Sequence, residues 1–260
     1  MRLAANLSML FSAQVTWQER CRRVAKQGFK GVEILFPYNK DIQLYKTALD
    51  KYNLETVLIN TPSKTGSFGY AALPNHEKLF QQAFDQAFDA AMVLNANAIH
   101  VMAGISLSGP VPNWQTHLLK NIDYALTKVA GTNILLQLEA LNSKDVPDYA
   151  YVDPLALIPI IQQLNSKQLG LQFDFYHTLV QGLHLLETLE KVRPFITHVQ
   201  IADPQKRHEP NFDKHPQLLQ GLKYLMETNY TGWVGLEYRP LTQFEESLGF
   251  LNILDNIIQQ

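Results

Sequence analysis

Short apolar runs rich in β-branched residues alternate with longer helical stretches along the whole chain, in eight pairs. This alternation is typical of a parallel sheet covered by helices. The predicted strands are Leu3–Asn6, Gly31–Phe36, Leu54–Asn60, Ala98–Ala103, Asn133–Ala140, Leu169–Phe175, the run that opens at Thr197, and Trp233–Tyr238. The predicted helices are Thr16–Gln27, Asp41–Tyr52, Glu77–Leu94, Asn113–Val129, Pro154–Leu164, Gly182–Val192, Pro216–Thr228 and Thr242–Ile258.

The regular count of eight units decides between two parallel-sheet folds. A doubly wound sheet would also fit the alternation, but eight regular units favour closure, and 260 residues is close to the ~250 typical of a (β/α)8 barrel. No linker is visible, and an apolar content of 46% is enough for a sizeable core. We therefore expect an α/β fold with one TIM-barrel domain over residues 1–260.

Charge and apolar patterning exclude several classes of partner. The formal charge of −2 and the lack of a Lys/Arg run argue against nucleic acid and against an anionic membrane surface. The longest apolar runs fall far below the ~20 residues that span a bilayer, and Met1–Gln14 lacks the apolar core of a signal peptide. The single cysteine, Cys21, cannot form an internal disulfide. These features predict a cytoplasmic protein with a small-molecule ligand.

Four oxygen-bearing side chains fall near the ends of four consecutive predicted strands, about one strand–helix unit apart. They are Glu139, Asp174, Gln200 and Glu237. In a closed barrel these strand ends meet at one face, where active sites are built. Three carboxylates that close would repel one another unless a cation held them. All-oxygen ligation favours Mg²⁺ or Mn²⁺ over zinc, so we expect a divalent metal held by these four residues.

Several neighbouring polar residues have competing interpretations. His177 can bind substrate or cap the following helix, and Glu33 can contact substrate or form a buried pair. His198 lies on the same strand face as Gln200 and can contact substrate or orient a carboxylate from behind. A single acid at a strand end is often only a cap or an ion-pair partner, but four in register make that explanation weaker. The loop Lys206–Glu209 resembles the rim of a site for an anionic substrate.

Six segments of the chain resemble the family of hydroxypyruvate and 2-oxo-tetronate isomerases, which are xylose isomerase-like TIM barrels. These segments read ANLSMLF, GFKGVEILFPYNKDI (28–42), LEALN, FDFYH, HVQIAD followed by residues 207–210, and YTGWVGLEYRP (230–240). The resemblance implies that Glu139, Asp174, Gln200 and Glu237 hold the metal. It also implies that Glu139 and Glu237 transfer protons and that His177 and Arg207 bind substrate.

The departures from the family pattern lie in loops that would form the substrate pocket. The segment after the third strand, NTPSKTGSFGYAALP, lacks the Gly-Asp-Trp and Gly-Glu-Arg-Gly elements of the family. The family's Glu-Pro-Ile-Asn is Glu139-Ala140-Leu141-Asn142 here, and His208 and Asn211 replace two glycines. The class of reaction is therefore better determined than the substrate.

The resemblance implies isomerisation of a small α-hydroxy keto acid through a cis-enediolate. The candidate conversions are hydroxypyruvate to tartronate semialdehyde and 2-oxo-tetronate to 3-oxo-tetronate. No G-x-G-x-x-G or P-loop signals an organic cofactor. The alternatives are a ketose 3-epimerase, which usually has His in place of Gln200, and a sugar-acid-binding barrel without catalysis. An abasic-site endonuclease would need a histidine-rich zinc cluster and a basic surface. Assembly into a homo-oligomer and the choice between Mg²⁺ and Mn²⁺ stay open.

Overall fold

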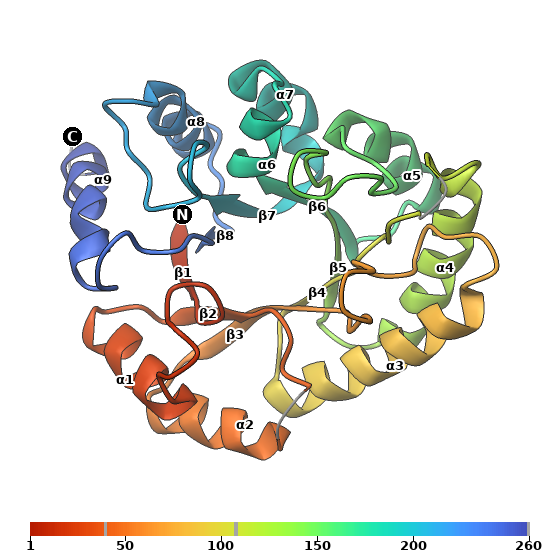
Figure 1. Cartoon of the computed structure of the whole chain (residues 1–260), viewed down its shortest axis with the longest axis horizontal. Helices are drawn as coiled ribbons and strands as arrows, with labels where there is room; N and C mark the ends of the chain where they lie inside the picture. The colour runs from red at the N-terminus through yellow and green to blue at the C-terminus, as the bar shows by residue number, and fades with distance from the viewer. Residues whose placement is uncertain (39–40, 107–108, 259–260) are drawn as a thin grey trace.

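The strands form one closed parallel barrel in chain order. The computed structural model describes residues 1–38, 41–106 and 109–258. The strands are β1 (Arg2–Asn6), β2 (Gly31–Ile34), β3 (Glu55–Asn60), β4 (Ala98–His100), β5 (Leu135–Leu138), β6 (Leu169–Asp174), β7 (Ile196–Ile201) and β8 (Trp233–Leu236). Because β1 pairs with β8 as well as with β2, the first and last strands meet and the sheet has no free edge (Figure 1). The expected TIM-barrel fold is confirmed.

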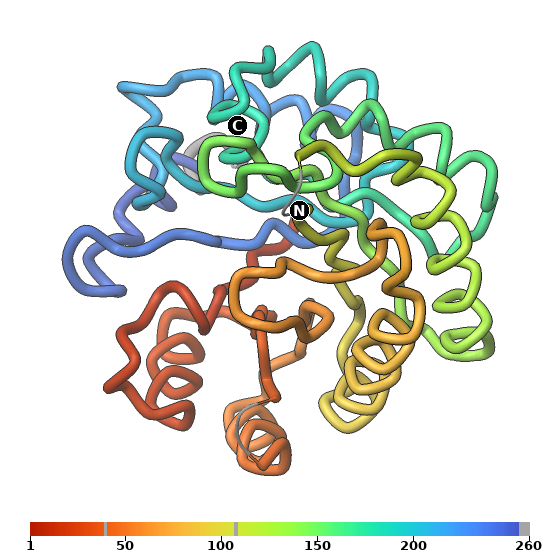
Figure 2. The backbone as a smooth tube through the Cα atoms, turned by 45° about the vertical axis from the view of Figure 1, so that its right-hand side comes forward, coloured from red at the N-terminus to blue at the C-terminus, as the bar shows by residue number. Residues whose placement is uncertain are grey.

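Helices between the strands form the outer ring (Figures 1 and 2). The α-helices are α1 (Trp17–Lys26), α2 (Ile42–Lys51), α3 (Glu77–Leu94), α4 (Trp114–Val129), α5 (Ile158–Leu164), α6 (Phe175–Val180), α7 (Leu185–Val192), α8 (Pro216–Glu227) and α9 (Leu251–Ile258). Three 3₁₀ helices are described as well: η1 (Pro154–Leu157), η2 (Arg193–Phe195) and η3 (Glu246–Phe250). None of the helices in the described ranges is long and apolar enough to cross a bilayer.

Helix α3 shows why these segments pack as a ring. It buries Phe80, Phe84, Ala87 and Ala91 at spacings of three and four residues, so its apolar side chains lie on one face. In α1, the Thr16 side chain accepts a hydrogen bond from the Glu19 backbone N–H and caps the helix start.

The structure departs from the predicted elements by more than three residues in two places, and by three residues at the end of β4 and at the start of α7. Helix α6 was missed, because Phe175 and its neighbours read as a continuation of strand β6. It begins directly after Asp174, whose carboxylate accepts the Tyr176 backbone N–H at 2.8 Å and caps it. The last predicted helix begins as η3 at Glu246 rather than at Thr242. Residues 39–40, within the segment 28–42, and residues 259–260 of the predicted domain lie outside the described ranges.

Two glycines allow large side chains to cross the barrel interior. A Cβ added at Gly31 would lie 2.5 Å from the Trp233 ring, and one added at Gly235 would lie 1.9 Å from Glu33 Oε1. Both distances are far below van der Waals contact, so a larger residue at either position would displace its neighbour. Gly235 therefore provides the space that Glu33 occupies beside the candidate site.

Candidate active site

The four predicted metal ligands lie at the carboxyl ends of β5 to β8. Glu139 follows the last residue of β5, Asp174 ends β6, Gln200 lies near the end of β7, and Glu237 follows β8. All four side chains are buried. Asp174 and Gln200 are direct partners in the β6–β7 register. Barrel closure thus gathers side chains that are far apart in the sequence.

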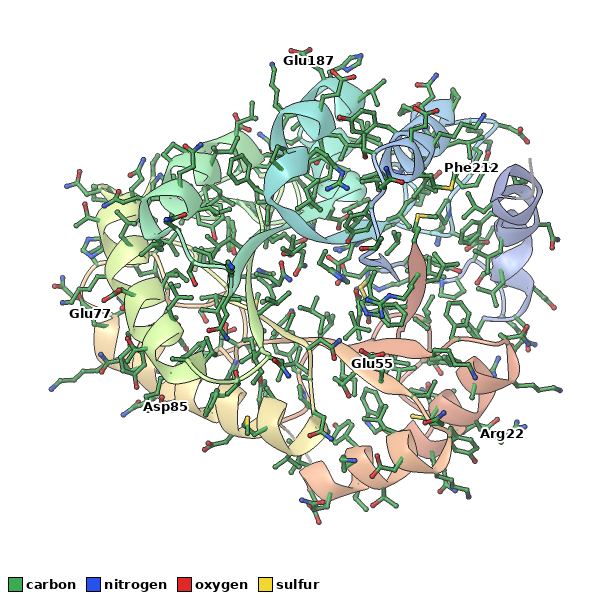
Figure 3. The ribbon with its side chains drawn as sticks, turned by 180° about the vertical axis from the view of Figure 1, so that it is seen from behind. Arg22, Glu55, Glu77, Asp85, Glu187 and Phe212 are labelled. Atoms are coloured by element: carbon green, nitrogen blue, oxygen red, sulfur yellow. The ribbon has the colours of Figure 1, made fainter. Side chains whose placement is uncertain are left out.

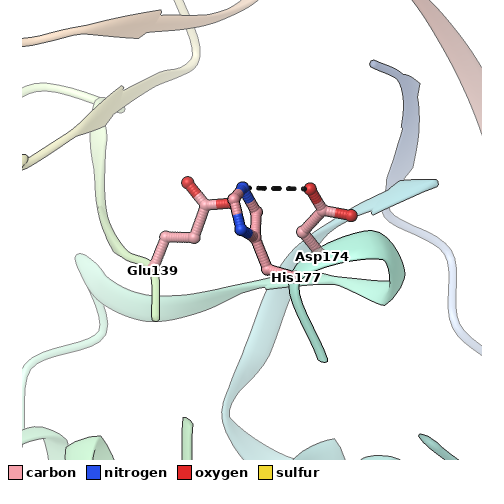
Figure 4. A group of neighbouring side chains, drawn as sticks. All are labelled: Glu139, Asp174 and His177. Carbon is pink, nitrogen blue, oxygen red and sulfur yellow. Dashed lines mark ion pairs between the residues drawn. The ribbon is translucent and has the colours of Figure 1, made fainter. Parts of the chain in front are cut away.

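Among the described residues, Glu139, Asp174 and His177 form a cluster of potential ligands, with one candidate atom from each within 4.8 Å of the others (Figure 4). Glu139 Oε1 and Asp174 Oδ2 are buried and accept no hydrogen bond from any of the described residues. Leaving buried carboxylate oxygens unpaired is costly, so such atoms call for a cation or a donor from a ligand. The cluster fits a divalent ion by this criterion.

His177 has a defined tautomer that argues against metal ligation. Its Nδ1 accepts hydrogen bonds from the Asn142 backbone N–H at 3.0 Å and from the Asn142 side-chain amide at 2.7 Å. The ring proton must then sit on Nε2, which faces Asp174 Oδ2 at 3.7 Å. Burial lowers the pKa of His177, and the charge of Arg207 lowers it further, so the ring is neutral. A neutral ring of this tautomer donates a hydrogen bond and offers no free lone pair.

Gln172, which sequence reasoning missed, joins two of the predicted ligands. Its amide nitrogen donates to Glu139 Oε2 at 2.8 Å and to Gln200 Oε1 at 2.7 Å. Gln200 in turn donates from Nε2 to Glu33 Oε2 at 3.0 Å, so its carbonyl oxygen is held away from Glu33. Gln172 lies two residues before Asp174, so both side chains lie on the same face of β6. This spacing of two residues could have identified Gln172 as a neighbour of the site.

Glu33 and His198 form a buried pair behind Gln200. His198 Nε2 lies 2.6 Å from Glu33 Oε1, and both side chains are fully or almost fully buried. Asn6 donates to Glu33 Oε2 at 2.9 Å and approaches Glu237 Oε1 at 3.5 Å. Both oxygens of Glu33 are therefore engaged by protein donors, and the pair contacts the site through Gln200.

Arg207 brings a positive charge among the carboxylates. Its Nη2 lies 2.5 Å from Glu237 Oε2 and 3.6 Å from Asp174 Oδ2, and its guanidinium carbon lies 4.6 Å from the centre of the Tyr176 ring. Tyr176 donates from its hydroxyl to Asp145 at 2.6 Å, which fixes the ring. The backbone of Arg207 is in the left-handed region, with φ of 53°. Such a conformation costs about 1 kcal/mol or more and is often found at functional sites.

Burial dominates the electrostatics of the three carboxyl groups. It raises the pKa of Glu139 well above its usual value, with further increases from Glu237 and Asp174. Burial also raises the pKa of Asp174 to about 6 and that of Glu237 to about 8, although Arg207 opposes both shifts. Anionic carboxylates here need a compensating positive charge, and Arg207 provides part of it.

Comparisons with known proteins agree with this geometry. A model of the Xylose isomerase-like TIM barrel family matches residues 21–254. The chain is 32% identical over 252 residues to 2-oxo-tetronate isomerase of Haemophilus influenzae, covering 92% of this chain and 93% of that one. It is 32% identical over 262 residues to hydroxypyruvate isomerase of Escherichia coli, covering 97% and 98%.

A solved structure is equally similar. The structure titled AP endonuclease, family 2, from Brucella melitensis superposes with a TM-score of 0.87 at 32% identity, covering 97% of this chain and 98% of that one. The family match and the full-length relatives lead to one assignment. The chain belongs to the xylose isomerase-like TIM barrels and, within them, to the family of hydroxypyruvate and 2-oxo-tetronate isomerases.

Proposed function

We propose that this protein is a metal-dependent isomerase of a small α-hydroxy keto acid, such as hydroxypyruvate or 2-oxo-tetronate. The observation that carries the proposal is the pair of buried oxygens on Glu139 and Asp174 that accept no hydrogen bond in the described part of the chain. Gln200 is the strand partner of Asp174, and the charge of Glu237 acts on Glu139. Glu139, Asp174, Gln200 and Glu237 would hold Mg²⁺ or Mn²⁺. Such an ion, when bound, polarises a substrate carbonyl and stabilises negative charge on its oxygens.

The residues of the chain account for the remaining steps. One of the two glutamates, Glu139 or Glu237, removes a proton from the carbon that bears the hydroxyl group. The substrate then passes through a cis-enediolate, and a glutamate returns a proton to the adjacent carbon. Arg207 can receive the substrate carboxylate through two parallel hydrogen bonds, and the His177 Nε2–H can donate to a substrate oxygen. Burial excludes water, which protects the reactive intermediate.

Turnover in D₂O tests this function directly. We expect hydroxypyruvate or 2-oxo-tetronate to isomerise with Mg²⁺ or Mn²⁺ present, and proton NMR to show deuterium at the carbon that receives the proton. A ketose 3-epimerase would instead convert a neutral ketose and leave the keto acids unchanged. No turnover of either acid with either ion would overturn the proposal.

An endonuclease is disfavoured by the same site. Among the described residues, the cluster of potential ligands holds two carboxylates and a single histidine rather than a histidine-rich set. The formal charge of −2 also gives no general attraction to a polyanion.

Metal binding should be lost when Asp174 is removed. Calorimetry should show one Mg²⁺ or Mn²⁺ per chain of wild type. In Asp174→Ala the affinity should fall at least about tenfold, since even residues that only orient a ligand are typically worth 10–100-fold. Asp85→Ala removes an acid that pairs with Lys128 on the surface and should bind as wild type does. Unchanged affinity in Asp174→Ala would remove Asp174 from the metal site.

Arg207→Lys tests carboxylate recognition, because lysine keeps the charge near Glu237 but loses the two-pronged geometry. Hydrogen bonds to charged groups contribute about 1.5–3 kcal/mol, so kcat/KM for the keto acid should fall by about tenfold or more. Dihydroxyacetone, a neutral ketose of the same length as hydroxypyruvate, should inhibit wild type and variant equally well. Arg22→Lys, at a surface pair with Glu19, is the matched control. Equal losses for acid and ketose would exclude this role of Arg207.

A further inference from the structure

A second cavity lies at the opposite end of the barrel from the carboxylates. It has a volume of about 350 Å³ and is lined by residues from the amino-terminal parts of the barrel strands and from the segments that precede β7 and β8, and it reaches His198 of the buried Glu33–His198 pair. We call it the lower cavity; the lining residues used below are Arg2, Gln137, Arg193, Tyr230 and Trp233. Its position separates it from Glu139, Asp174 and Glu237, which lie at the other ends of the strands.

The lower cavity carries positive charge without a counter-charge in its walls. Arg2 and Arg193 both line it, and none of its described lining residues is an aspartate or glutamate. Within the described ranges neither arginine takes part in an ion pair, and the Arg2 guanidinium has no hydrogen-bond acceptor. A pocket of this kind attracts anions, because its low-dielectric walls strengthen the field of the two charges.

Aromatic rings hold both guanidinium groups in place. The guanidinium carbon of Arg2 lies 4.2 Å from the centre of the Trp233 ring, and that of Arg193 lies 5.2 Å from the centre of the Tyr230 ring. Arg193 also donates to the side chain and the backbone carbonyl of Thr228, each at 2.9 Å. Because these contacts already restrict the two arginine side chains, the side chains lose less conformational entropy when a ligand binds.

Two neutral side chains add unused hydrogen-bond donors. Gln137 is only 1% exposed and accepts from the Thr197 hydroxyl at 2.7 Å, which leaves its amide nitrogen without a partner in the described part of the chain. Trp233 is 7% exposed, and its buried indole N–H has no acceptor among residues 1–38, 41–106 and 109–258. Buried donors without acceptors are uncommon in folded proteins and indicate an absent partner. Both residues line the lower cavity, and a ligand with oxygen atoms bound there would supply an acceptor for the Gln137 amide.

We propose that the lower cavity binds a small phosphate anion, either inorganic phosphate or a small phosphate monoester. Two arginines suit a dianion, since each guanidinium offers a planar pair of N–H donors to phosphate oxygens. The volume is at the small end of ligand pockets, about 300–1,000 Å³, which matches a compact monoester rather than a dinucleotide. The aromatic walls would contact the carbon part of such an ester. This site is independent of the proposed isomerase reaction, and either can fail without the other.

Calorimetry on the full chain, with inorganic phosphate and glycerol 3-phosphate as separate probes, tests the proposal. EDTA is present so that no metal ion carries the anion to the other site. Wild type should bind one probe molecule per chain with a dissociation constant in the millimolar range or below. Arg2→Gln and Arg193→Gln should each weaken binding at least about tenfold, the value of a charged hydrogen bond. Tighter binding of glycerol 3-phosphate would identify the monoester as the ligand, and equal binding would identify the free ion.

Two control variants separate this site from others. Arg22→Gln removes the same charge at the surface and should bind within about twofold of wild type, as expected for a screened surface charge. Arg207→Lys, which alters the other end of the barrel, should also leave binding unchanged. In the described part of the chain the Arg2 guanidinium makes no hydrogen bond, whereas Arg193 bonds to Thr228. Arg2→Gln therefore still tests the proposal if Arg193→Gln fails to fold. The proposal is overturned if wild type binds neither probe at about 10 mM, a very weak affinity. It is also overturned if Arg2→Gln binds as tightly as wild type, or if Arg207→Lys alone abolishes binding.

Discussion

Glu139→Gln and Glu237→Gln should each lose turnover by about 10²–10⁴-fold, the usual contribution of a positioned acid or base. Each glutamine keeps a carbonyl oxygen that can still bind the metal, but it cannot accept a proton at neutral pH. Metal affinity should therefore persist, weakened by the lost negative charge, while kcat falls. Steady-state kinetics and calorimetry on the same samples measure the two effects. Alanine would be a poorer probe, because it removes the metal ligand together with the base.

Exchange in D₂O distinguishes the two glutamates if they serve different carbons. The variant that retains the base for the substrate's own C–H should still exchange that hydrogen slowly, and the other variant should not. Glu187→Gln is the matched control, because Glu187 pairs with Lys191 on the surface of α7, far from the barrel axis (Figure 3). The assignment fails if either active-site variant binds metal normally and isomerises within about tenfold of wild type, less than the range above allows.

His198→Ala should destabilise the fold by about 3 kcal/mol or more. The substitution removes the donor that lies 2.6 Å from Glu33 Oε1 and leaves a fully buried carboxylate short of a partner. Breaking a buried pair by deleting one member typically costs about 3–5 kcal/mol. Urea unfolding measures the change as a lower midpoint at constant slope.

Comparison with another histidine isolates the effect of burial. His184→Ala removes an exposed side chain that accepts the Glu187 N–H at 3.3 Å at the start of α7 and should cost only about 1 kcal/mol, as for other helix caps. The double variant Glu33→Leu/His198→Ala should cost less than the sum of its single variants, because no buried charge is left behind. Equal costs for His198→Ala and His184→Ala would show that the Glu33–His198 pair contributes little stability.

The barrel could be predicted because its signals are local. The helical spacing in α3 and the alternation of apolar residues in β6 depend on residues close in sequence, and eight repeats of the strand–helix pattern leave few ways to close a sheet. Helix α6 was not predicted, because the local sequence gives no signal for its start. Its apolar sequence follows β6 without a turn residue, and its start is set by the carboxylate of Asp174, which also belongs to the candidate site.

The sequence by itself placed Glu139, Asp174, Gln200 and Glu237 at strand ends, because a parallel barrel brings all carboxyl ends of its strands to one face. Only the tertiary structure decided their partners. Gln172 bridges Glu139 and Gln200, and Glu33 reaches His198 across 165 positions of the chain. Arg207, whose backbone has a left-handed conformation, contacts Glu237. No local sequence pattern predicted either the conformation or the contact. Hydrogen bonds and ion pairs require atoms within a few ångströms, and such distances between remote residues exist only once the barrel has closed.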